Sequence, residues 1–260
     1  MKKTFFALLI IFLFLGFAQA QKPGEWKMRK STHFIVYYNF APYDFIEQLI
    51  GKSEDYYATI ADALGFRRFD FWLWEDRAKI YIYDDSKSYL ISTGQPQWSI
   101  GHAVPAEKVI KSFVGQMSFF ETVLPHEMGH IIFREFVGFN NAAVPLWLDE
   151  GIASYQEPLR RAVSLKIVED AAALNKLIGI SELHKINPSA FKDMQEVNLF
   201  YAESLSIVDY LIKKFGSLKL ALFCQGLRDQ KDINKALGLA YSFEGIGELD
   251  SAWQKDIRNE

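Results

Sequence analysis

A short motif near the middle of the chain limits what the chain can fold into. Residues 121–136 read ETVLPHEMGHIIFREF and place His126 and His130 four residues apart inside an apolar run. The whole chain has only five histidines among 260 residues. Two scarce polar side chains in a hydrophobic segment are either core residues with local hydrogen bonds or the ligands of a metal ion.

An α-helix would bring the two histidines to one point. Residues four apart on a helix differ by about 40° and one turn of rise, so His126 and His130 project from one face. Zinc accepts neutral imidazole at about 2.0–2.1 Å. Glu127 is offset by about 100°, where it can take a proton from a water molecule that the metal activates. Pro125 has no backbone N–H to donate, so we expect it near the start of this helix or at a kink in it.

A third ligand is needed, because catalytic zinc usually has three protein ligands. The segment PLWLDEGIASYQE offers Glu150, and the turn at residues 138–145 is short enough to fold a second helix back antiparallel to the first. We therefore predict that Glu150 is a ligand, against the alternative of an ordinary acid at a helix end. Asp149 is expected behind the ligands or facing solvent. Gly151 is expected to let the two helices approach closely.

The order of the patterns predicts an α+β fold. Four segments rich in β-branched and aromatic residues are expected to be strands: residues 32–39, 78–84, 99–104 and 107–113. A helix is expected between Pro42 and Gly65. Downstream of about residue 117 the periodicity becomes helical. The expected helices there are residues 119–137, 145–156, 161–177, 198–215 and 218–227, with Gly138 and Gly216 as C-terminal caps.

This order also predicts two lobes. An α/β lobe of about residues 21–137 includes the HEMGH helix, and a mainly helical lobe covers about residues 138–260. The active-site cleft is expected between them. Net charge is −3 and no concentrated basic face is visible in the sequence, which argues against a nucleic-acid partner.

Residues 1–20 have the features of a secretory signal peptide. A basic MKK start precedes the apolar run TFFALLIIFLFLGFA, which is short for a membrane span of about 20 residues. The AQA that follows fits a signal cleavage site. We expect export to a bacterial periplasm or the extracellular space, with residues 21–260 as the catalytic domain. The alternative is an uncleaved anchor, the one case in which a membrane partner is expected.

The motif pair HEMGH and WLDEGIASY resembles the gluzincin clan of zinc metallopeptidases. The chain is most similar to small secreted proteins with a peptidase MA-like domain. THFIVYY and YAESLSIVDYLIKKFG are also similar to that group, and the resemblance covers about residues 26–216. It implies a zincin-like metallopeptidase fold that hydrolyses a peptide or protein substrate.

The resemblance also implies roles for individual residues. It makes His126, His130 and Glu150 the ligands of one zinc ion, with Glu127 as the general base. Tyr201 is a candidate to stabilise the oxyanion, because relatives in the wider clan use a tyrosine from a later helix. The alternative for Tyr201 is a half-buried aromatic on an apolar helix face.

One position departs from the family pattern. Many such enzymes have an acid four residues after the ligand glutamate, where it orients a zinc histidine, but here the residue is Ser154. Losing such a partner commonly costs about 10–100-fold in affinity or activity. Asp149 and Glu157 are the candidates to compensate. A second hypothesis is therefore a zinc-binding but catalytically weak or inactive binding or scaffold protein on a peptidase fold. A third is an exported helical protein whose H-E-x-x-H is accidental.

The other histidines have weaker patterns. His102 lies on a strand that could edge the cleft and pair with an extended substrate, although a surface histidine is the simpler interpretation. His184 is expected to be exposed or locally bonded, and His33 to be structural.

Three further side chains are expected to be structural. The dense apolar cluster that contains Trp72 and Trp74 is expected to pack in the core. Cys224 is the only cysteine and is expected to be a buried small hydrophobic residue, so no internal disulfide is possible.

Overall fold

The computed structural model describes residues 26–66, 72–116, 118–186, 191 and 193–258. The predicted signal peptide and its cleavage site lie outside this part of the chain. None of the helices in the described part combines the length and apolar character that a membrane span requires.

Five strands form one mixed sheet in the order β1-β2-β3-β5-β4. Their bounds are β1 Lys27–Lys30, β2 Phe34–Tyr38, β3 Ala78–Tyr83, β4 Gly101–Val104 and β5 Val109–Phe113. The central strands β2, β3 and β5 are parallel, whereas β1 and β4 run antiparallel at the two edges. The four predicted strands are confirmed. Strand β1 was not predicted, because its KMRK sequence is polar and mostly exposed and lacks the alternation of a half-buried strand.

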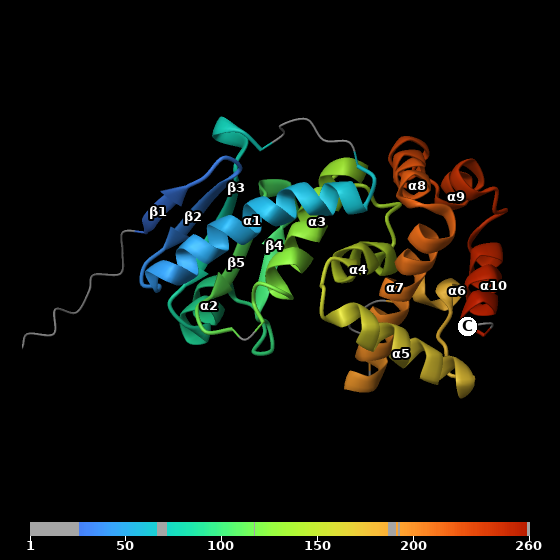
Figure 1. The fold of residues 1–260 in the computed structure, drawn as a ribbon. Coiled ribbons are helices and arrows are strands. Elements are labelled where there is room, and N and C mark those ends of the chain that lie inside the picture. Colours follow the sequence, from blue (N-terminus) through green and yellow to red (C-terminus); the bar gives the residue numbers. More distant parts are fainter. Residues whose placement is uncertain (1–25, 67–71, 117, 187–190, 192, 259–260) are drawn as a thin grey trace, which may run out of the picture.

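Three helices lie between the strands or directly after the last strand in the sequence. They are α1 (Tyr43–Ala63), α2 (Ser86–Thr93) and α3 (Val123–Val137). Helix α1 follows Pro42 as predicted and lies across the sheet in Figure 1. Helix α2 was not predicted; the Asp85 side chain caps it by accepting from the Ser88 N–H at 2.7 Å.

The described chain after α3 is built from helices. These are α4 (Leu146–Tyr155), α5 (Arg160–Ala173), α6 (Ile180–Leu183), α7 (Met194–Phe215), α8 (Ser217–Gln230), α9 (Ile233–Tyr241) and α10 (Ile246–Ile257). Figure 1 shows the sheet and helices α5 to α10 on opposite sides of the molecule, with α3 and α4 between them. The mixed α+β class is confirmed. Gly138 and Gly216 end α3 and α7 with φ of 99° and 85°, as the sequence predicted.

The core is one continuous cluster of buried apolar side chains that extends from β2 to α10. Trp72 and Cys224 belong to it, and both are fully buried. The prediction for Trp74 is wrong, because its side chain is 77% exposed. Trp74 begins a short 3₁₀ turn with a positive φ of 55°, and this turn directs it away from the cluster that Trp72 joins.

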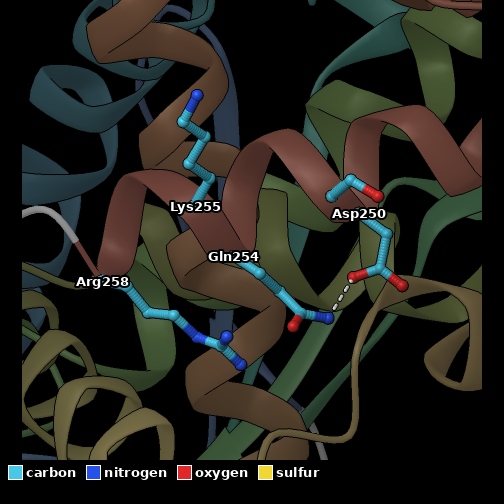
Figure 2. Close-up of a pocket in the computed structure, with 5 residues that line it drawn as sticks. Asp250, Gln254, Lys255 and Arg258 are labelled. Atoms are coloured by element: carbon cyan, nitrogen blue, oxygen red, sulfur yellow. Dashed lines mark hydrogen bonds between the residues drawn. The ribbon is translucent and has the colours of Figure 1, made fainter.

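A polar hollow on α10 is lined by Asp250, Ser251, Gln254, Lys255 and Arg258 (Figure 2). Asp250 accepts hydrogen bonds from the Ser181 N–H at 3.1 Å and from Gln254 Nε2 at 2.8 Å. This carboxylate therefore joins α6 to α10. The hollow contains no histidine, so the metal chemistry predicted from the sequence must lie elsewhere.

Candidate metal centre

Helix α3 presents both motif histidines in regular turns. Because the helix begins at Val123, Pro125 is its third residue, where a backbone N–H has no partner within the helix. Proline is therefore tolerated at this position without a kink. Met128 and Ile132 on the buried face hold α3 in the core.

The turn after α3 folds α4 back along it. Asn141 fixes this turn: its Nδ2 donates to the carbonyl oxygens of Val137 at 3.0 Å and Leu227 at 3.1 Å. Its Oδ1 accepts from the Ala143 N–H at 3.1 Å. The helices are antiparallel, because the earlier α3 residue His126 meets the later residue Glu157, whereas His130 meets Asp149.

Two glycines set the distances between the helices. A Cβ on Gly129 would lie 2.9 Å from Cα of Ala153, so Gly129 allows α3 to approach α4. A Cβ on Gly151 would lie 2.3 Å from the carbonyl oxygen of Ser204 in α7. The expectation that Gly151 lets α3 and α4 approach each other closely is therefore wrong. Its missing side chain admits α7 and brings Tyr201, three residues before Ser204, toward the motif.

The ligand atoms of the three predicted residues converge. We call His126, His130 and Glu150 the ligand triad. The two histidine Nε2 atoms lie 3.2 Å apart, and Oε2 of Glu150 lies 3.5 Å and 3.7 Å from them. This oxygen is buried and has no hydrogen-bond partner among the described residues. A search of the described residues for three or more histidine, cysteine, aspartate or glutamate side chains close enough to share a metal ion finds this triad.

These spacings fit a single zinc ion. Four ligands at about 2.0–2.1 Å from zinc, at the corners of a tetrahedron, are about 3.3–3.4 Å apart. With Nδ1–H of each neutral histidine donating to a carboxylate, both Nε2 lone pairs turn toward each other and toward Glu150. Two lone pairs and a carboxylate oxygen repel one another unless a cation lies between them. The donor set of the triad therefore fits zinc and leaves a fourth position open.

Each histidine is held from behind by an acid–arginine pair. Nδ1 of His130 lies 2.9 Å from Oδ1 of Asp149, whose Oδ2 accepts from Nε of Arg134 at 2.8 Å. Nδ1 of His126 lies 2.8 Å from Oε1 of Glu157, which also accepts from Nη1 of Arg160 at 3.1 Å. Such contacts fix the tautomer and orientation of metal-binding histidines.

The electrostatics of the site favour a cation. Burial alone would lower the pKa of His126, but Glu150 and Glu157 raise it to about 10. Burial also opposes protonation of His130, but Asp149 and Glu150 raise its pKa above the ordinary value. In both rings a proton takes the place that a metal would fill. With neutral histidines, the carboxylates of Glu127, Asp149, Glu150 and Glu157 outnumber the guanidinium groups of Arg134 and Arg160 by two charges, which a divalent cation balances.

Glu127 lies beside the triad. Burial raises its pKa above the ordinary value, although His126 and His130 pull it down. A contact with the backbone N–H of Ala103, on the edge strand β4, also lowers the pKa. Because burial raises the pKa, the environment strengthens the carboxylate as a base.

Tyr201 lies on α7 within electrostatic range of the same residues. Burial and the charge of Glu150 raise its pKa to about 12, while Arg160 opposes this. The Arg160 guanidinium lies 5.1 Å from the centroid of the Tyr201 ring. The ring also packs edge-on against Phe200, with centroids 5.4 Å apart. The position is therefore compatible with both interpretations of Tyr201, the half-buried aromatic and the residue that faces the site.

The Ser154 side chain makes no hydrogen bond to a motif histidine, which is the contact expected of an acid at this position. It is fully buried, and its Oγ has no hydrogen-bond partner among the described residues. Glu157 and Asp149, the two candidates to compensate, contact His126 and His130 respectively.

The remaining histidines lie outside the triad. His33 is structural as expected: its Nδ1 lies 2.5 Å from Glu54 and its ring stacks on Tyr57. His184 is exposed. His102 lies on the edge strand β4, where Nδ1 lies 2.8 Å from the hydroxyl of buried Tyr89.

Sequence reasoning missed the two arginines and the N–H of Ala103. Arg134 lies four residues after His130, and Arg160 three residues after Glu157, so helical spacing from the acids and histidines was an available signal. No local signal indicates Ala103, because its contact with Glu127 depends on how the sheet edge meets α3.

Comparison with known protein families gives a match that includes this site. The model described as the peptidase MA superfamily matches residues 74–259, a range that contains the triad, Glu127, Glu157 and Tyr201. It begins after β1, β2 and α1. No curated protein matches the chain significantly.

Proposed function

The chain belongs to the peptidase MA superfamily, and from this premise we propose that it is a zinc-dependent metallopeptidase that hydrolyses peptide bonds. In this proposal His126, His130 and Glu150 hold one zinc ion, and Glu127 is the general base. We also propose that residues 1–20 direct export and that the substrate lies between the sheet-bearing and helical parts of the chain.

The observation that carries the proposal is the convergence of three ligand atoms: the Nε2 atoms of His126 and His130 and Oε2 of Glu150. Their separations of 3.2, 3.5 and 3.7 Å match the edges of a zinc tetrahedron of about 3.3–3.4 Å. Three protein ligands and one open position are typical of catalytic zinc, whereas structural zinc has four protein ligands.

The residues around the triad have the chemistry that peptide hydrolysis needs. A bound zinc ion would polarise the substrate carbonyl and lower the pKa of the attacking water. Glu127 takes the proton of that water and delivers it to the leaving amine, and its raised pKa suits both steps. Tyr201 donates its phenol proton in a hydrogen bond to the developing oxyanion, because its raised pKa keeps the phenol protonated.

The test compares wild type with Glu127→Gln. We expect both proteins to bind one zinc ion per chain by elemental analysis. Wild type should cleave members of a quenched-fluorescence peptide library and lose this activity with a chelator. The Gln variant should lose at least about 100-fold in kcat, the low end of what general acid–base catalysis contributes. Glu169→Gln, on the exposed surface of α5, is the matched control.

Three results would contradict the proposal in different ways. Equal cleavage by Glu127→Gln and wild type would refute the base assignment. A zinc-loaded wild type that cleaves no library member would favour the binding or scaffold alternative. A wild type that takes up no zinc would refute the metal site.

A further inference from the structure

We propose that Glu157 is the positioning residue of His126, and that Arg160 pairs with Glu157 while contacting the ring of Tyr201. The acid expected one turn after Glu150 is in this chain found at the second residue beyond the end of α4. This inference rests on the proposed function, since it concerns the same zinc site.

The geometry favours Glu157 over residue 154. Ser154 Oγ is buried without a partner, whereas Glu157 Oε1 lies 2.8 Å from Nδ1 of His126. On a helix, residues 154 and 157 both lie within about 40° of Glu150, so either could face the same histidine. Glu157 follows the helix through a turn in which its N–H donates to the Ser154 carbonyl at 3.1 Å. The side chain of Glu157 therefore points in the direction that helical geometry gives it, although Glu157 lies beyond the last helical residue.

The charge of Glu157 requires a partner, because its side chain is only 5% exposed. Arg160 supplies it, with Nη1 3.1 Å from the same oxygen that faces His126. A buried carboxylate without a cation is costly, whereas the pair can remain charged. The charged form accepts the Nδ1 proton of His126 and thereby keeps its Nε2 lone pair directed into the triad.

Arg160 also connects this pair to α7. Its guanidinium carbon lies 5.1 Å from the centroid of Tyr201, within the range of a cation–π contact. Arg134, the counterpart behind His130, contacts Asp149 and the carbonyl of Asn141 instead. Of these two pairs, the Glu157–Arg160 pair is the one that links a metal ligand to the candidate oxyanion donor.

The first test uses Glu157→Gln, a substitution of nearly equal volume. Zinc affinity is measured by competition with a chromophoric chelator, and the site is also read from the visible spectrum of the Co²⁺-loaded protein. We expect zinc affinity about 10–100-fold weaker than wild type and a shifted cobalt spectrum. Glu182→Gln, whose side chain is 63% exposed, is the matched control and should change neither.

A second variant asks whether the acid can be moved back. Ser154→Asp in the Glu157→Gln background should recover most of the lost zinc affinity if circular dichroism shows the native helix content. Ser154 is fully buried, so an aspartate there can disturb folding. Glu157→Asp, which leaves residue 154 unchanged, is therefore made in parallel. It keeps the charge for Arg160 but shortens the reach to His126, so its zinc affinity should lie between those of wild type and Glu157→Gln.

The link to Tyr201 is tested with Arg160→Gln. We expect a lower kcat at saturating zinc with KM little changed, because the phenol acts on the transition state. Arg258→Gln, at the exposed residue that follows α10, is the control. Equal kcat in Arg160→Gln and wild type would refute the link.

The outcomes separate this inference from the proposed function. If wild type binds zinc but Glu157→Gln binds it equally tightly with an unchanged cobalt spectrum, this inference fails and the proposed function stands. If wild type binds zinc without cleaving peptides, the proposed function fails, while zinc affinity and cobalt spectrum still decide the role of Glu157.

Discussion

Asp149, behind the ligand triad, and Glu203, in helix α7, are both buried carboxylates, but their pKa values move in opposite directions. Burial would raise the pKa of each. At Asp149 the charges of His130 and Arg134 overcome burial and lower its pKa. Among the described residues, Glu203 accepts hydrogen bonds from the backbone N–H groups of Ile178 at 2.7 Å and Gly179 at 3.0 Å. Burial therefore raises its pKa to about 7, with a further contribution from Asp250.

The difference shows what neighbouring cations do for a buried acid. Around the triad, each acid behind a histidine has an arginine, so the region is built to stay charged when buried. Around Glu203, two N–H groups hold the carboxylate as a clamp on the segment before α6, and neutrality below pH 7 removes the cost of a buried charge. The first region is suited to a metal ion and the second to fixing one helix against another.

Among the substitutions that test this comparison, Glu150→Gln is expected to have the largest effect, a loss of zinc affinity. It removes a charge and a ligand atom from the triad itself, so the loss of zinc affinity should exceed the roughly 100-fold that follows removal of a residue behind a ligand. Dialysed protein should contain no stoichiometric zinc by elemental analysis. Retention of one zinc per chain would show that Glu150 is not a ligand. Glu182→Gln again serves as the exposed control.

The next prediction concerns Glu203. Its folded pKa of about 7 exceeds the ordinary value of 4.5, so the folded chain binds the proton more tightly than the unfolded chain does. The resulting stability is fully present below pH 4.5 and is lost as pH rises through about 7. Up to about 3 kcal/mol is involved, at 1.36 kcal/mol for each pKa unit. Urea unfolding at pH 5 and pH 8 should show this loss in wild type.

Glu203→Gln isolates that contribution from other titrating groups. The free energy of unfolding of this variant should fall less between pH 5 and pH 8 than that of wild type. The same pH dependence in both proteins would show that Glu203 titrates normally and that the contrast with Asp149 does not hold.

The smallest expected effect is that of Asp149→Asn. Asparagine can still accept the hydrogen bond of His130 but no longer balances Arg134, so zinc affinity should fall about 10–100-fold without abolishing binding. Chelator competition measures the change, with the exposed Asp170→Asn as control. A loss as complete as that of Glu150→Gln would make Asp149 a ligand, which the distances do not suggest.

Much of the fold follows from local patterns. The four predicted strands and the six predicted helices are present, because alternation and helical periodicity are carried by consecutive residues. Strand β1 and helices α2, α6, α9 and α10 were missed. The first has a polar sequence, and α6 spans only four residues, so neither carries a full period of apolar residues.

The sequence by itself determined the triad as a hypothesis, since spacing on a helix fixes the directions of His126, Glu127 and His130, and WLDEG supplies the third ligand. Only the tertiary structure decided which residues stand behind the triad. Glu157 meets His126 across 31 residues, and Gly151 meets α7 and not α3. Such contacts depend on where turns and close helix approaches place whole elements, and no local periodicity carries that information.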